Sequence, residues 1–491
     1  MDAAVIVVGA GPVGLMLAGE LRLAGIDVLV VERLSEPTGE SRGLGFTART
    51  LEVFNQRGLL PRFGDIEVNP RGHFGGIPLD YTVLEGAHFG ARGIVQARTE
   101  AVLAAWVEEL GARVLRNREL VGLHARDGGV EIEVRSPEGP VRLRAEYVVG
   151  CDGGRSSVRK LANFEFPGTD ATREMFLADV AGCALRPRPI GEKLPGGMVM
   201  AAPTGDGVDR IIVCESGTPP RRRTEPPGFD EVAAAWQRIT GEDIRHGSPV
   251  WVSAFGDATR QATEYRRGRV LLAGDAAHTH LPAGGQGLSF GVQDAVNLGW
   301  KLAAQVLSRA PAGLLDTYHA ERHPAGVRLL RNTLAQGLLY LSGSEVEPLR
   351  EVMAELMRLD VVGRHLAGMV SGLDLRYDVG DGDHPLLGRR LPDHDLVRDS
   401  EKIRAFELLH PGRGVLLDFG DDGGLRTAAA GWADRVDPVT ATPYAIDAGS
   451  GLADTDALLV RPDGHVAWAA PGAAGRLTDA LERWFGAPLP T

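Results

Sequence analysis

A glycine-rich turn near the N-terminus constrains the fold of this chain most strongly. The apolar run from Val5 to Val8 predicts a strand buried on both faces, and Gly9, Gly11 and Gly14 follow it in G-x-G-x-x-G spacing. Apolar residues at helical period come next, and the run from Val28 to Val31 predicts a second buried strand. A strand, a glycine turn, a helix and a second strand in this order are typical of a dinucleotide-binding unit.

Each glycine of this turn has a physical role in such a unit. Gly9 permits the tight turn, Gly11 lets the backbone approach a pyrophosphate, and Gly14 lets the helix pack closely on the strand. The start of the helix offers free N–H groups to the phosphates. Glu32 ends the second strand and is placed to accept hydrogen bonds from a ribose diol. The motif does not distinguish NAD from FAD.

Composition limits the class of protein. A chain of 491 residues is expected to form two or three domains, and its formal net charge of −12 argues against nucleic acid as a partner. No apolar run is long enough to span a membrane, and a core strand begins within three residues of the start, so we expect no signal peptide and a cytoplasmic protein. Three widely separated cysteines exclude a C-x-x-C pair and fit a reducing compartment.

Two carboxylates follow predicted strands further along the chain. The strand that begins at Tyr147 leads to Asp152 and Gly153, and the strand that begins at Val270 leads to Gly274 and Asp275. A carboxylate at the C-terminal end of a parallel strand points toward the crevice where ligands of such sheets bind. An Asp-Gly pair also favours a turn for purely structural reasons, so for the first motif both interpretations remain open.

A glycine-rich loop follows the second carboxylate. It contains Pro282, Gly284, Gly285 and Gly287 and leads into a predicted helix. Glycines here let backbone N–H groups point directly at a ligand at the start of the helix. The nearby residues His278 and His280 lack an acidic ligand cluster, so we interpret them as structural and expect no metal site. Arg42 is either a surface arginine or a contact to a phosphate or to a flavin edge.

The chain divides into three predicted domains. Residues 1–163 and 262–384 form the nucleotide-binding domain with its C-terminal helices. Residues 164–261 contain strands joined by Pro- and Gly-rich loops around a helix from Phe229 to Thr240, which predicts an inserted mixed sheet that serves as a substrate platform. Residues 385–491 form a small α/β domain without cysteine, which excludes a redox role for it.

These motifs together resemble the class A flavoprotein aromatic hydroxylases, the p-hydroxybenzoate hydroxylase-like monooxygenases. The resemblance is carried by the glycine turn ending at Glu32, by Asp152-Gly153, and by Gly274-Asp275 with the P-x-G-G-x-G continuation, and it covers essentially the whole chain. The segment LLVRPDGHVAW is similar to the tail of the branch with a thioredoxin-like C-terminal domain. The most similar subgroup is the angucycline and anthracycline polyketide hydroxylases. The implied fold is α/β: a Rossmann-like FAD-binding domain of the glutathione reductase-type variant, an inserted sheet and a thioredoxin-like domain.

The resemblance also implies roles for individual residues. Pro282 would line the flavin near its reactive carbon, and the backbone of Gly284 and Gly285 would face its pyrimidine edge, so these three form the expected catalytic set. Ser289 stands where the family usually has Asn, which changes the expected contact there. The residues implied to bind non-covalent FAD are Gly9, Gly11, Pro12, Gly14, Glu32, Arg33, Arg42, Gln96, Asp152, Asp275, Pro282, Gly284, Gly285, Gly287, Leu288 and Ser289.

The implied activity is a monooxygenase reaction on a polycyclic aromatic polyketide, such as an angucyclinone or anthracyclinone. NAD(P)H reduces FAD, O2 then gives a flavin C4a-hydroperoxide, and one oxygen is transferred to the ring, while the protein supplies position and a dry site. The sequence does not identify any side chain as the base that would deprotonate a phenol. Alternatives are Baeyer–Villiger or ring-rearranging oxygenation and, from another class, a flavin-binding protein without oxygenase activity. An NAD-dependent dehydrogenase is disfavoured by Gly274-Asp275. We expect a monomer or homodimer.

Overall fold

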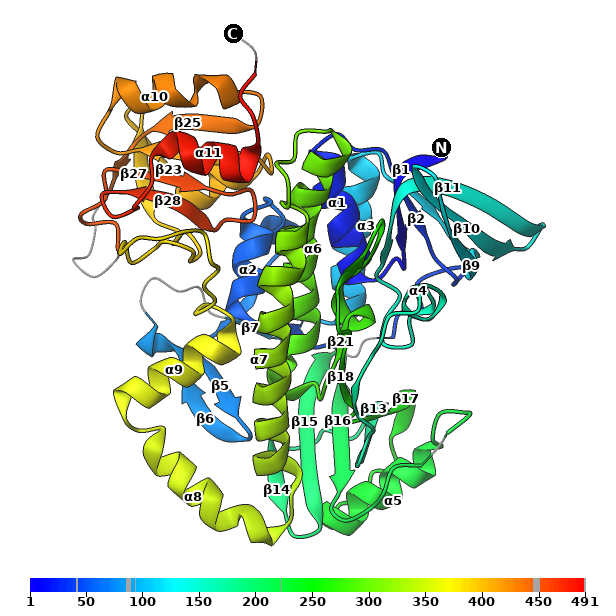
Figure 1. Ribbon diagram of the computed structural model, residues 1–491. Coiled ribbons are helices and arrows are strands. Elements are labelled where there is room, and N and C mark those ends of the chain that lie inside the picture. Colours follow the sequence, from blue (N-terminus) through cyan, green and yellow to red (C-terminus); the bar gives the residue numbers. More distant parts are fainter. Residues whose placement is uncertain (41–42, 85–89, 93, 222, 445–450, 490–491) are drawn as a thin grey trace.

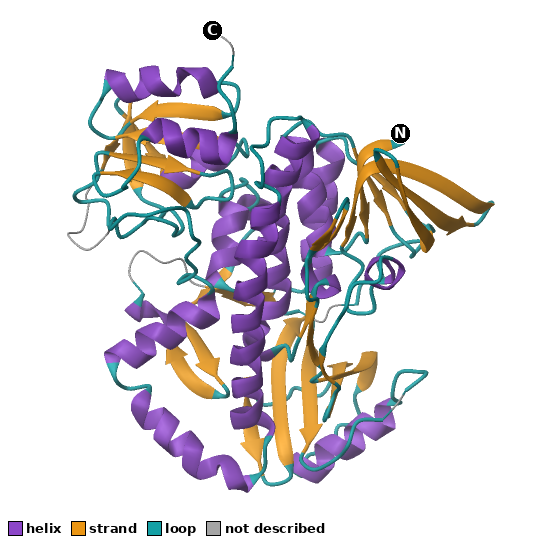
Figure 2. Ribbon diagram, viewed as in Figure 1, coloured by secondary structure: helices purple, strands orange, loops and turns teal. Residues whose placement is uncertain are grey.

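Two long helices run through the middle of the molecule. The computed structural model describes residues 1–40, 43–84, 90–92, 94–221, 223–444 and 451–489. The central helices are α6 (Gln286–Val306) and α7 (Asp316–Leu341). In Figure 1 the N-terminal sheet lies on one side of their upper ends, the C-terminal domain lies on the other side, and an antiparallel sheet lies beside the lower half of α7. Figure 2 shows the same arrangement of helical and sheet layers.

The N-terminal sheet is built on the strand predicted at Val5 to Val8. Its order is β19-β20-β11-β1-β2-β8, with β9 and β10 added as an antiparallel extension of β11. β1 is parallel to both β2 and β11, and β11 is parallel to β20. The strands are β1 (Ala3–Val8), β2 (Val28–Val31), β8 (Arg113–Leu115), β9 (Glu119–Arg126), β10 (Gly129–Ser136), β11 (Gly139–Gly150), β19 (Arg266–Arg267) and β20 (Val270–Leu272). This is the predicted Rossmann-like sheet.

Helices α1 (Pro12–Leu23) and α3 (Gln96–Glu109) pack together beside this sheet, and α6 packs against α1. Close approach depends on small residues, because a Cβ on Gly19 of α1 would lie 2.0 Å from the Trp106 ring of α3. α6 is buried along most of its length, as expected for a helix that contacts three parts of the molecule.

The inserted sheet has the order β14-β15-β16-β13-β17. All four pairings are antiparallel, so the expectation of a mixed sheet was wrong in this respect; the short turns that join β14 to β15 and β15 to β16 permit only antiparallel pairing. α5 (Phe229–Thr240) lies where it was predicted and covers one face. The strands are β13 (Glu174–Ala181), β14 (Arg188–Leu194), β15 (Gly197–Gly205), β16 (Val208–Glu215) and β17 (Ser248–Gly256).

Shorter elements connect these layers. Hairpin β5–β6 packs its apolar residues against α7 and α9. Two small sheets, β3-β7-β4 and β12-β18-β21, lie outside the main sheets. The bounds are α2 (Ala48–Asn55), α4 (Ser157–Leu161), α8 (Glu347–Leu356), α9 (Asp360–Ser371), β3 (Gly45–Phe46), β4 (Glu67–Asn69), β5 (Arg71–Phe74), β6 (Ile77–Asp80), β7 (Gly90–Arg92), β12 (Gly168–Thr169), β18 (Thr259–Gln261) and β21 (His278–Thr279).

The sequence pattern predicts a helix from Leu314 to Val327 and a further pair of helices between Leu329 and Met369, and the course of α7 differs from this. The structure instead has one helix that continues through Pro324 to Leu341. Proline removes one backbone N–H and crowds the preceding turn. Gln261 Nε2 donates a hydrogen bond to the His323 carbonyl at 2.9 Å, next to this defect. Packing on both sides of α7 therefore outweighs the local preference for a break.

The C-terminal domain has a four-stranded sheet in the order β25-β24-β27-β28. β24 is parallel to β25 and antiparallel to β27, which is the arrangement of a thioredoxin-like fold. Its elements are β24 (Gly414–Asp418), α10 (Gly423–Ala429), β25 (Val436–Thr440), β27 (Ala457–Val460), β28 (Val466–Ala470) and α11 (Leu477–Phe485), with a small outer sheet of β22 (Asp395–Arg398), β23 (Glu401–Arg404) and β26 (Thr442–Pro443). All three cysteines are free and lie outside this domain.

Candidate active site

The turn from Gly9 to Gly14, here called the fingerprint turn, has two glycines that the protein itself requires. A Cβ on Gly9, which has φ +107°, would lie 2.5 Å from the Cys151 carbonyl oxygen, and a Cβ on Gly14 would lie 2.0 Å from the Gly9 oxygen. A Cβ on Gly11 would meet no atom of the described residues within 4 Å. No side chain caps the start of α1, where Pro12 occupies the first turn. The turn therefore leaves space and N–H groups for a pyrophosphate beside Gly11.

Glu32 holds the fingerprint turn in place. Its Oε2 accepts a hydrogen bond from the Ala10 N–H at 2.8 Å, and its Oε1 accepts one from the Leu34 N–H at 3.0 Å. Carboxylate oxygens have further lone pairs, so these bonds leave capacity for a ribose hydroxyl. Arg33 is exposed beside it, and Arg42 lies outside the described residues.

Gln96 begins α3 and donates from Nε2 to Glu100 Oε1 at 2.8 Å. Burial raises the pKa of Glu100, and the nearby Glu32 carboxylate adds to the rise. Gln96 and Glu100 therefore place a second polar pair next to Glu32, close to the fingerprint turn. Glu100 was not singled out from the sequence, and the signal for it was its position one helical turn after Gln96.

The Asp152-Gly153 turn lies against the fingerprint turn. A Cβ on Gly9 would come 3.0 Å from the Cα of Asp152. Asp152 Oδ2 accepts hydrogen bonds from the N–H groups of Ser157 at 2.6 Å and Val158 at 3.1 Å, at the start of α4. Burial raises the pKa of this carboxyl. The structure thus gives Asp152 a helix-capping contact, and a cofactor contact stays a prediction.

Arg159 joins the two carboxylate motifs, and it was not singled out from the sequence. Its Nη2 donates to the Gly154 carbonyl at 2.7 Å and its Nη1 donates to the Ala276 carbonyl at 2.8 Å. The guanidinium carbon lies 3.7 Å from the centre of the Phe166 ring. A buried arginine on α4 therefore fixes both turns relative to each other. Its position seven residues after Asp152 was the only sequence signal.

The Gly274-Asp275 turn packs on the first turn of α1. A Cβ on Gly274, which has φ +63°, would lie 2.9 Å from Val13 Cγ2. The Gly274 N–H donates to Asp294 Oδ2 at 3.0 Å, and Asp294 of α6 is fully buried. Asp275 itself is exposed at the mouth of this turn. The fold therefore brings both carboxylate motifs to the fingerprint turn, as the sequence predicted for a shared crevice.

Asp294 is the centre of a second buried cluster. It accepts hydrogen bonds from Gly274, from Arg322 Nε at 2.7 Å, and lies 2.7 Å from His278 Nε2. Burial alone would raise the pKa of Asp294, but Arg322 and His278 hold it below its usual range. His278 therefore serves as a hydrogen-bond partner. Among the residues that the structure describes, no group of three His, Cys, Asp or Glu side chains is placed to hold a metal ion.

The segment from Pro282 to Gly287, here called the glycine loop, leads into α6. Gly284 and Gly285 have φ of +67° and +65°, which favours glycine at both positions. In the part of the chain that the structure describes, a Cβ on Gly285 would meet no atom within 4 Å, and no side chain caps the start of α6. Pro282 is exposed at its edge. The loop thus offers an open backbone surface at Gly285, and the uncapped start of α6 offers N–H groups, to a flat ligand.

The two residues after the glycine loop have different surroundings. Leu288 is half-buried, whereas Ser289 is 1% exposed. Ser289 Oγ accepts a hydrogen bond from the Thr47 N–H at 3.1 Å, and the Ser289 carbonyl accepts one from Thr50 Oγ1 at 3.2 Å. The Ser289 hydroxyl therefore joins α6 to the start of α2. This contact gives a physical account of a serine at the position where asparagine was expected.

One face of the inserted sheet meets the glycine loop. Strand residues alternate between α5 and this loop: Phe176, Ala178 and Val180 face α5, whereas Met175 lies in the cluster with Leu281. The buried residues of this second cluster, here called the apolar wall, are Met175, Met198, Cys214, Leu281, Ala283, Tyr340 and Leu341. The wall therefore packs the inserted sheet directly against the loop region.

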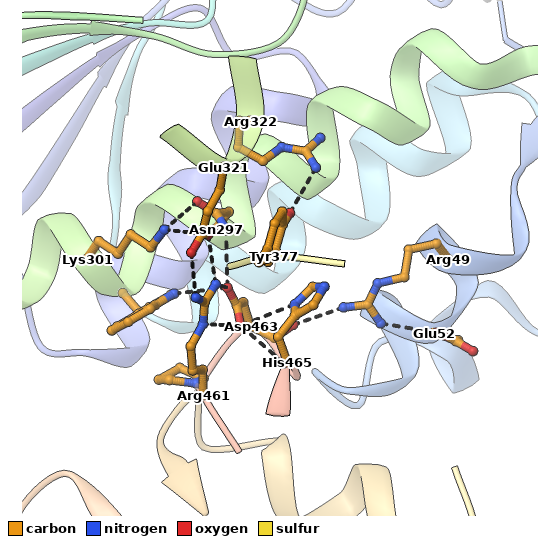
Figure 3. A network of polar contacts seen from close by, with 12 residues as sticks. Arg49, Glu52, Asn297, Lys301, Glu321, Arg322, Tyr377, Arg461, Asp463 and His465 are labelled. Carbon is orange, nitrogen blue, oxygen red and sulfur yellow. Dashed lines mark hydrogen bonds and ion pairs between the residues drawn. The ribbon is translucent and has the colours of Figure 1, made fainter. Parts of the chain in front are cut away.

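A network of buried charges joins the C-terminal domain to α6 and α7 (Figure 3). Arg461 pairs with Glu321 of α7 and with Asp463, and Asp463 Oδ2 accepts hydrogen bonds from Asn297 and Trp300 of α6 at 3.3 Å each. Burial alone would raise the pKa of Glu321, but Arg461 and Lys301 lower it to about 2. The sequence signal for this network was the R-P-D-G-H portion of the segment LLVRPDGHVAW, which contains Arg461 and Asp463.

The comparisons with known proteins follow this geometry. A family model described as "FAD binding domain" matches residues 2–333, and one described as "Aromatic-ring hydroxylase, C-terminal" matches residues 384–488. The chain belongs to the FAD-dependent aromatic-ring hydroxylase family. A 12-dehydrotetracycline 5-monooxygenase/anhydrotetracycline 6-monooxygenase of Streptomyces rimosus subsp. rimosus is 45% identical over 499 residues, covering 99% of each chain.

Solved structures agree with this assignment. CabE, an aromatic hydroxylase from angucycline biosynthesis, is 64% identical with a TM-score of 0.97 over 99% of this chain and 100% of its own. BexE, studied for oxidation during BE-7585A biosynthesis, is 63% identical with a TM-score of 0.95 over the whole of both chains. The predicted family and fold class are confirmed. The chain is an FAD-dependent monooxygenase that uses NAD(P)H and O2.

The residues present fit FAD. The open space beside Gly11, the oxygens of Glu32 and the uncapped starts of α1 and α6 provide complementary groups for pyrophosphate, ribose and ring. Among the described helices, none combines the length and apolar character that a membrane-spanning helix needs.

Proposed function

We propose that this chain hydroxylates a polycyclic aromatic polyketide of the angucyclinone type. The observation that carries the proposal is the contact between the glycine loop and the apolar wall, in which Leu281 and Ala283 of the loop region pack with Met175 and Met198 of the inserted sheet. This juxtaposition would hold an apolar ring system next to the flavin. One relative acts on dehydrotetracycline and anhydrotetracycline and another is an aromatic hydroxylase of angucycline biosynthesis, which supports the substrate class.

The proposed roles of individual residues rest on the resemblance and, where the structure describes the residue, on its position. Gly9, Gly11, Pro12, Gly14, Glu32, Arg33, Arg42, Gln96, Asp152 and Asp275 would hold the dinucleotide, and Gly287, Leu288 and Ser289 would form the ring end of the site. When bound, FAD accepts a hydride from NAD(P)H and activates O2. Pro282, Gly284 and Gly285 would border the reacting face, where uncapped N–H groups of α6 favour negative charge. The wall would exclude water from the site.

The proposed division into domains follows the same assignment. Residues 1–163 and 262–384 would bind FAD, residues 164–261 would form the substrate domain, and residues 385–491 would form the thioredoxin-like domain. The last of these would have a structural role, because it contains no cysteine and its Arg461 and Asp463 contact α6 and α7. Polyketide naphthols are acidic and electron-rich, so the reaction would not need a strong protein base.

Turnover with labelled oxygen tests the proposal. Purified FAD-loaded enzyme is supplied with NADPH, 18O2 and a panel of angucyclinone and anthracyclinone precursors, and the product masses are measured. One labelled oxygen on a ring carbon is the expected result. A labelled lactone would establish Baeyer–Villiger oxygenation instead. Failure of NADPH to bleach the flavin with every compound would favour a flavin-binding protein without oxygenase activity.

A further inference from the structure

A chain of three buried side-chain amides connects the glycine loop to hairpin β5–β6. Gln286 Nε2 donates to the Ala283 carbonyl at 3.0 Å, and Asn332 Nδ2 donates to Gln286 Oε1 at 2.9 Å. Gln336 Nε2 donates to Asn332 Oδ1 at 3.0 Å, and the Gly75 N–H donates to Gln336 Oε1 at 3.2 Å. Gln286 and Asn332 are each 4% exposed and Gln336 is 0% exposed, so solvent cannot replace these bonds.

The direction of this chain is fixed by its two ends. A backbone N–H at Gly75 can only donate, and a backbone carbonyl at Ala283 can only accept. Each amide between them therefore has its oxygen toward Gly75 and its nitrogen toward Ala283. Hydrogen bonds aligned in one direction polarise and strengthen one another, whereas loss of one member leaves buried polar groups unpaired. This series of four hydrogen bonds is thus more sensitive to the loss of one member than four separate hydrogen bonds would be.

The loop end of the chain holds the backbone that is proposed to face the flavin. Gln286 is the first residue of α6, and its side chain turns back over the left-handed pair Gly284 and Gly285 to reach Ala283. A Cβ on Gly284 would lie 3.3 Å from Gln286 Nε2. The Gln286 side chain therefore braces the turn from inside the protein and leaves the open side of Gly285 free.

The other end of the chain holds the tip of the hairpin against the apolar wall. Arg350 Nη1 donates to the Gly75 carbonyl at 2.6 Å, and the His73 ring centre lies 5.6 Å from that of Tyr340. Tyr340 belongs to the wall, and its hydroxyl donates to the Ile190 carbonyl of the inserted sheet at 2.6 Å. β5 also contacts the glycine loop directly. The hairpin thus borders both the loop and the wall.

We propose that Gln286, Asn332 and Gln336 are positioning residues that couple the glycine loop to hairpin β5–β6. FAD bound at the loop stabilises the hairpin through these amides, and a substrate held between wall and hairpin stabilises the loop in return, because coupling between two sites is reciprocal. The substrate half of this inference rests on the proposed function. The FAD half rests on the family's cofactor, on the proposed contact of FAD with the glycine loop, and on the four hydrogen bonds.

Hydrogen exchange tests the FAD half without turnover. Exchange of the peptide that contains residues 71–80 is measured by mass spectrometry in FAD-free and FAD-loaded protein. FAD should slow its exchange by about tenfold in the wild-type protein and by less than twofold in Asn332→Leu, which removes the middle amide. Thr333→Val is the matched control, because Thr333 is also buried on α7, and its hydroxyl donates to the Leu330 carbonyl of its own helix and to no other group among the described residues.

Gln336→Met removes the next amide of the series and should reduce the FAD-dependent slowing of exchange in the same way. This second variant keeps the test valid if Asn332→Leu does not fold. An FAD-dependent slowing as large in both amide variants as in the wild type would overturn the proposal, as would no slowing in the wild type.

Turnover tests the substrate half. With the substrate that the wild-type enzyme hydroxylates, the amide variants should release several-fold more H2O2 per NADPH oxidised, while Thr333→Val matches the wild type. If the amide variants release no more H2O2 per NADPH oxidised than the wild type, the substrate half of the inference is contradicted. If the wild-type enzyme hydroxylates none of the compounds but FAD still slows hydrogen exchange of the hairpin peptide, the proposed function fails and the FAD half of this inference stands.

Discussion

Both carboxylate oxygens of Glu321 accept hydrogen bonds from Arg461, although 140 residues separate the two in sequence: Nη1 lies 2.6 Å from Oε1 and Nη2 lies 2.9 Å from Oε2. Arg461 is fully buried and Glu321 is 9% exposed. A bidentate pair in this setting is strong but is stabilising only while both partners remain. It fastens the C-terminal domain to α7 and, through Asp463, to α6.

Removal of Arg461 should therefore destabilise the protein severely. Arg461→Met leaves Asp463 buried without its cation and leaves Glu321 paired with Lys301 alone, at a cost of about 3–5 kcal/mol. Unfolding in urea, followed by fluorescence, measures the change. The control is Arg62→Met, which breaks the solvent-exposed pair with Glu109 and should cost about 1 kcal/mol or less. An equal decrease in the free energy of unfolding in the two variants would show that the buried pair contributes no more stability than the exposed pair.

Titration of a neighbouring histidine should make stability depend on pH. Burial lowers the pKa of His465 from 6.5 to about 4. Between these values the unfolded chain binds a proton that the folded protein does not, so stability falls as the pH falls through this window. We expect the urea midpoint of the FAD-saturated protein to be lower at pH 5 than at pH 7. His465→Phe should show a smaller difference between the two pH values.

The control for this prediction is His124→Gln, since His124 is exposed on β9. It should retain the whole wild-type difference between pH 7 and pH 5. A His465→Phe variant with the same pH dependence as the wild type would mean that other groups account for it.

The sequence predicted those parts of the fold that depend on local pattern. The strands at Val5 to Val8 and Val28 to Val31 and the helix from Phe229 to Thr240 follow from unbroken periodicity and glycine boundaries, and the structure has them there. The continuation of α7 through Pro324 was missed, because it depends on packing from both sides and not on the local sequence.

The residues of the candidate site likewise divide into those that the sequence could identify and those that it could not. The fingerprint turn and the glycine loop could be found because glycine spacing reflects a local backbone requirement. Arg159, Asn332 and Gln336 could not, because each owes its role to partners more than forty residues away or to carbonyls brought close by folding. A polar residue on a helix has the same sequence signature whether it faces water or a buried amide.

The fingerprint turn offers the sharpest separation of fold from cofactor binding. Gly11→Ala and Gly14→Ala add the same methyl group three residues apart. The methyl group at residue 11 meets none of the described atoms within 4 Å, and Gly11 has φ −78°, which alanine adopts readily. The methyl group at residue 14 would lie 2.0 Å from the Gly9 oxygen. One substitution should affect only the ligand, and the other should affect the protein.

We therefore expect FAD-free Gly11→Ala to melt within about 2 °C of the wild type and to bind FAD at least about tenfold more weakly, a difference of about 1.4 kcal/mol. Gly14→Ala should lower the melting temperature of the FAD-free protein by several degrees, because β1 and α1 must move apart. Calorimetry and quenching of flavin fluorescence measure the two quantities. Wild-type FAD affinity in Gly11→Ala would mean that the pyrophosphate does not approach the backbone at Gly11, and the assignment of the crevice would have to change.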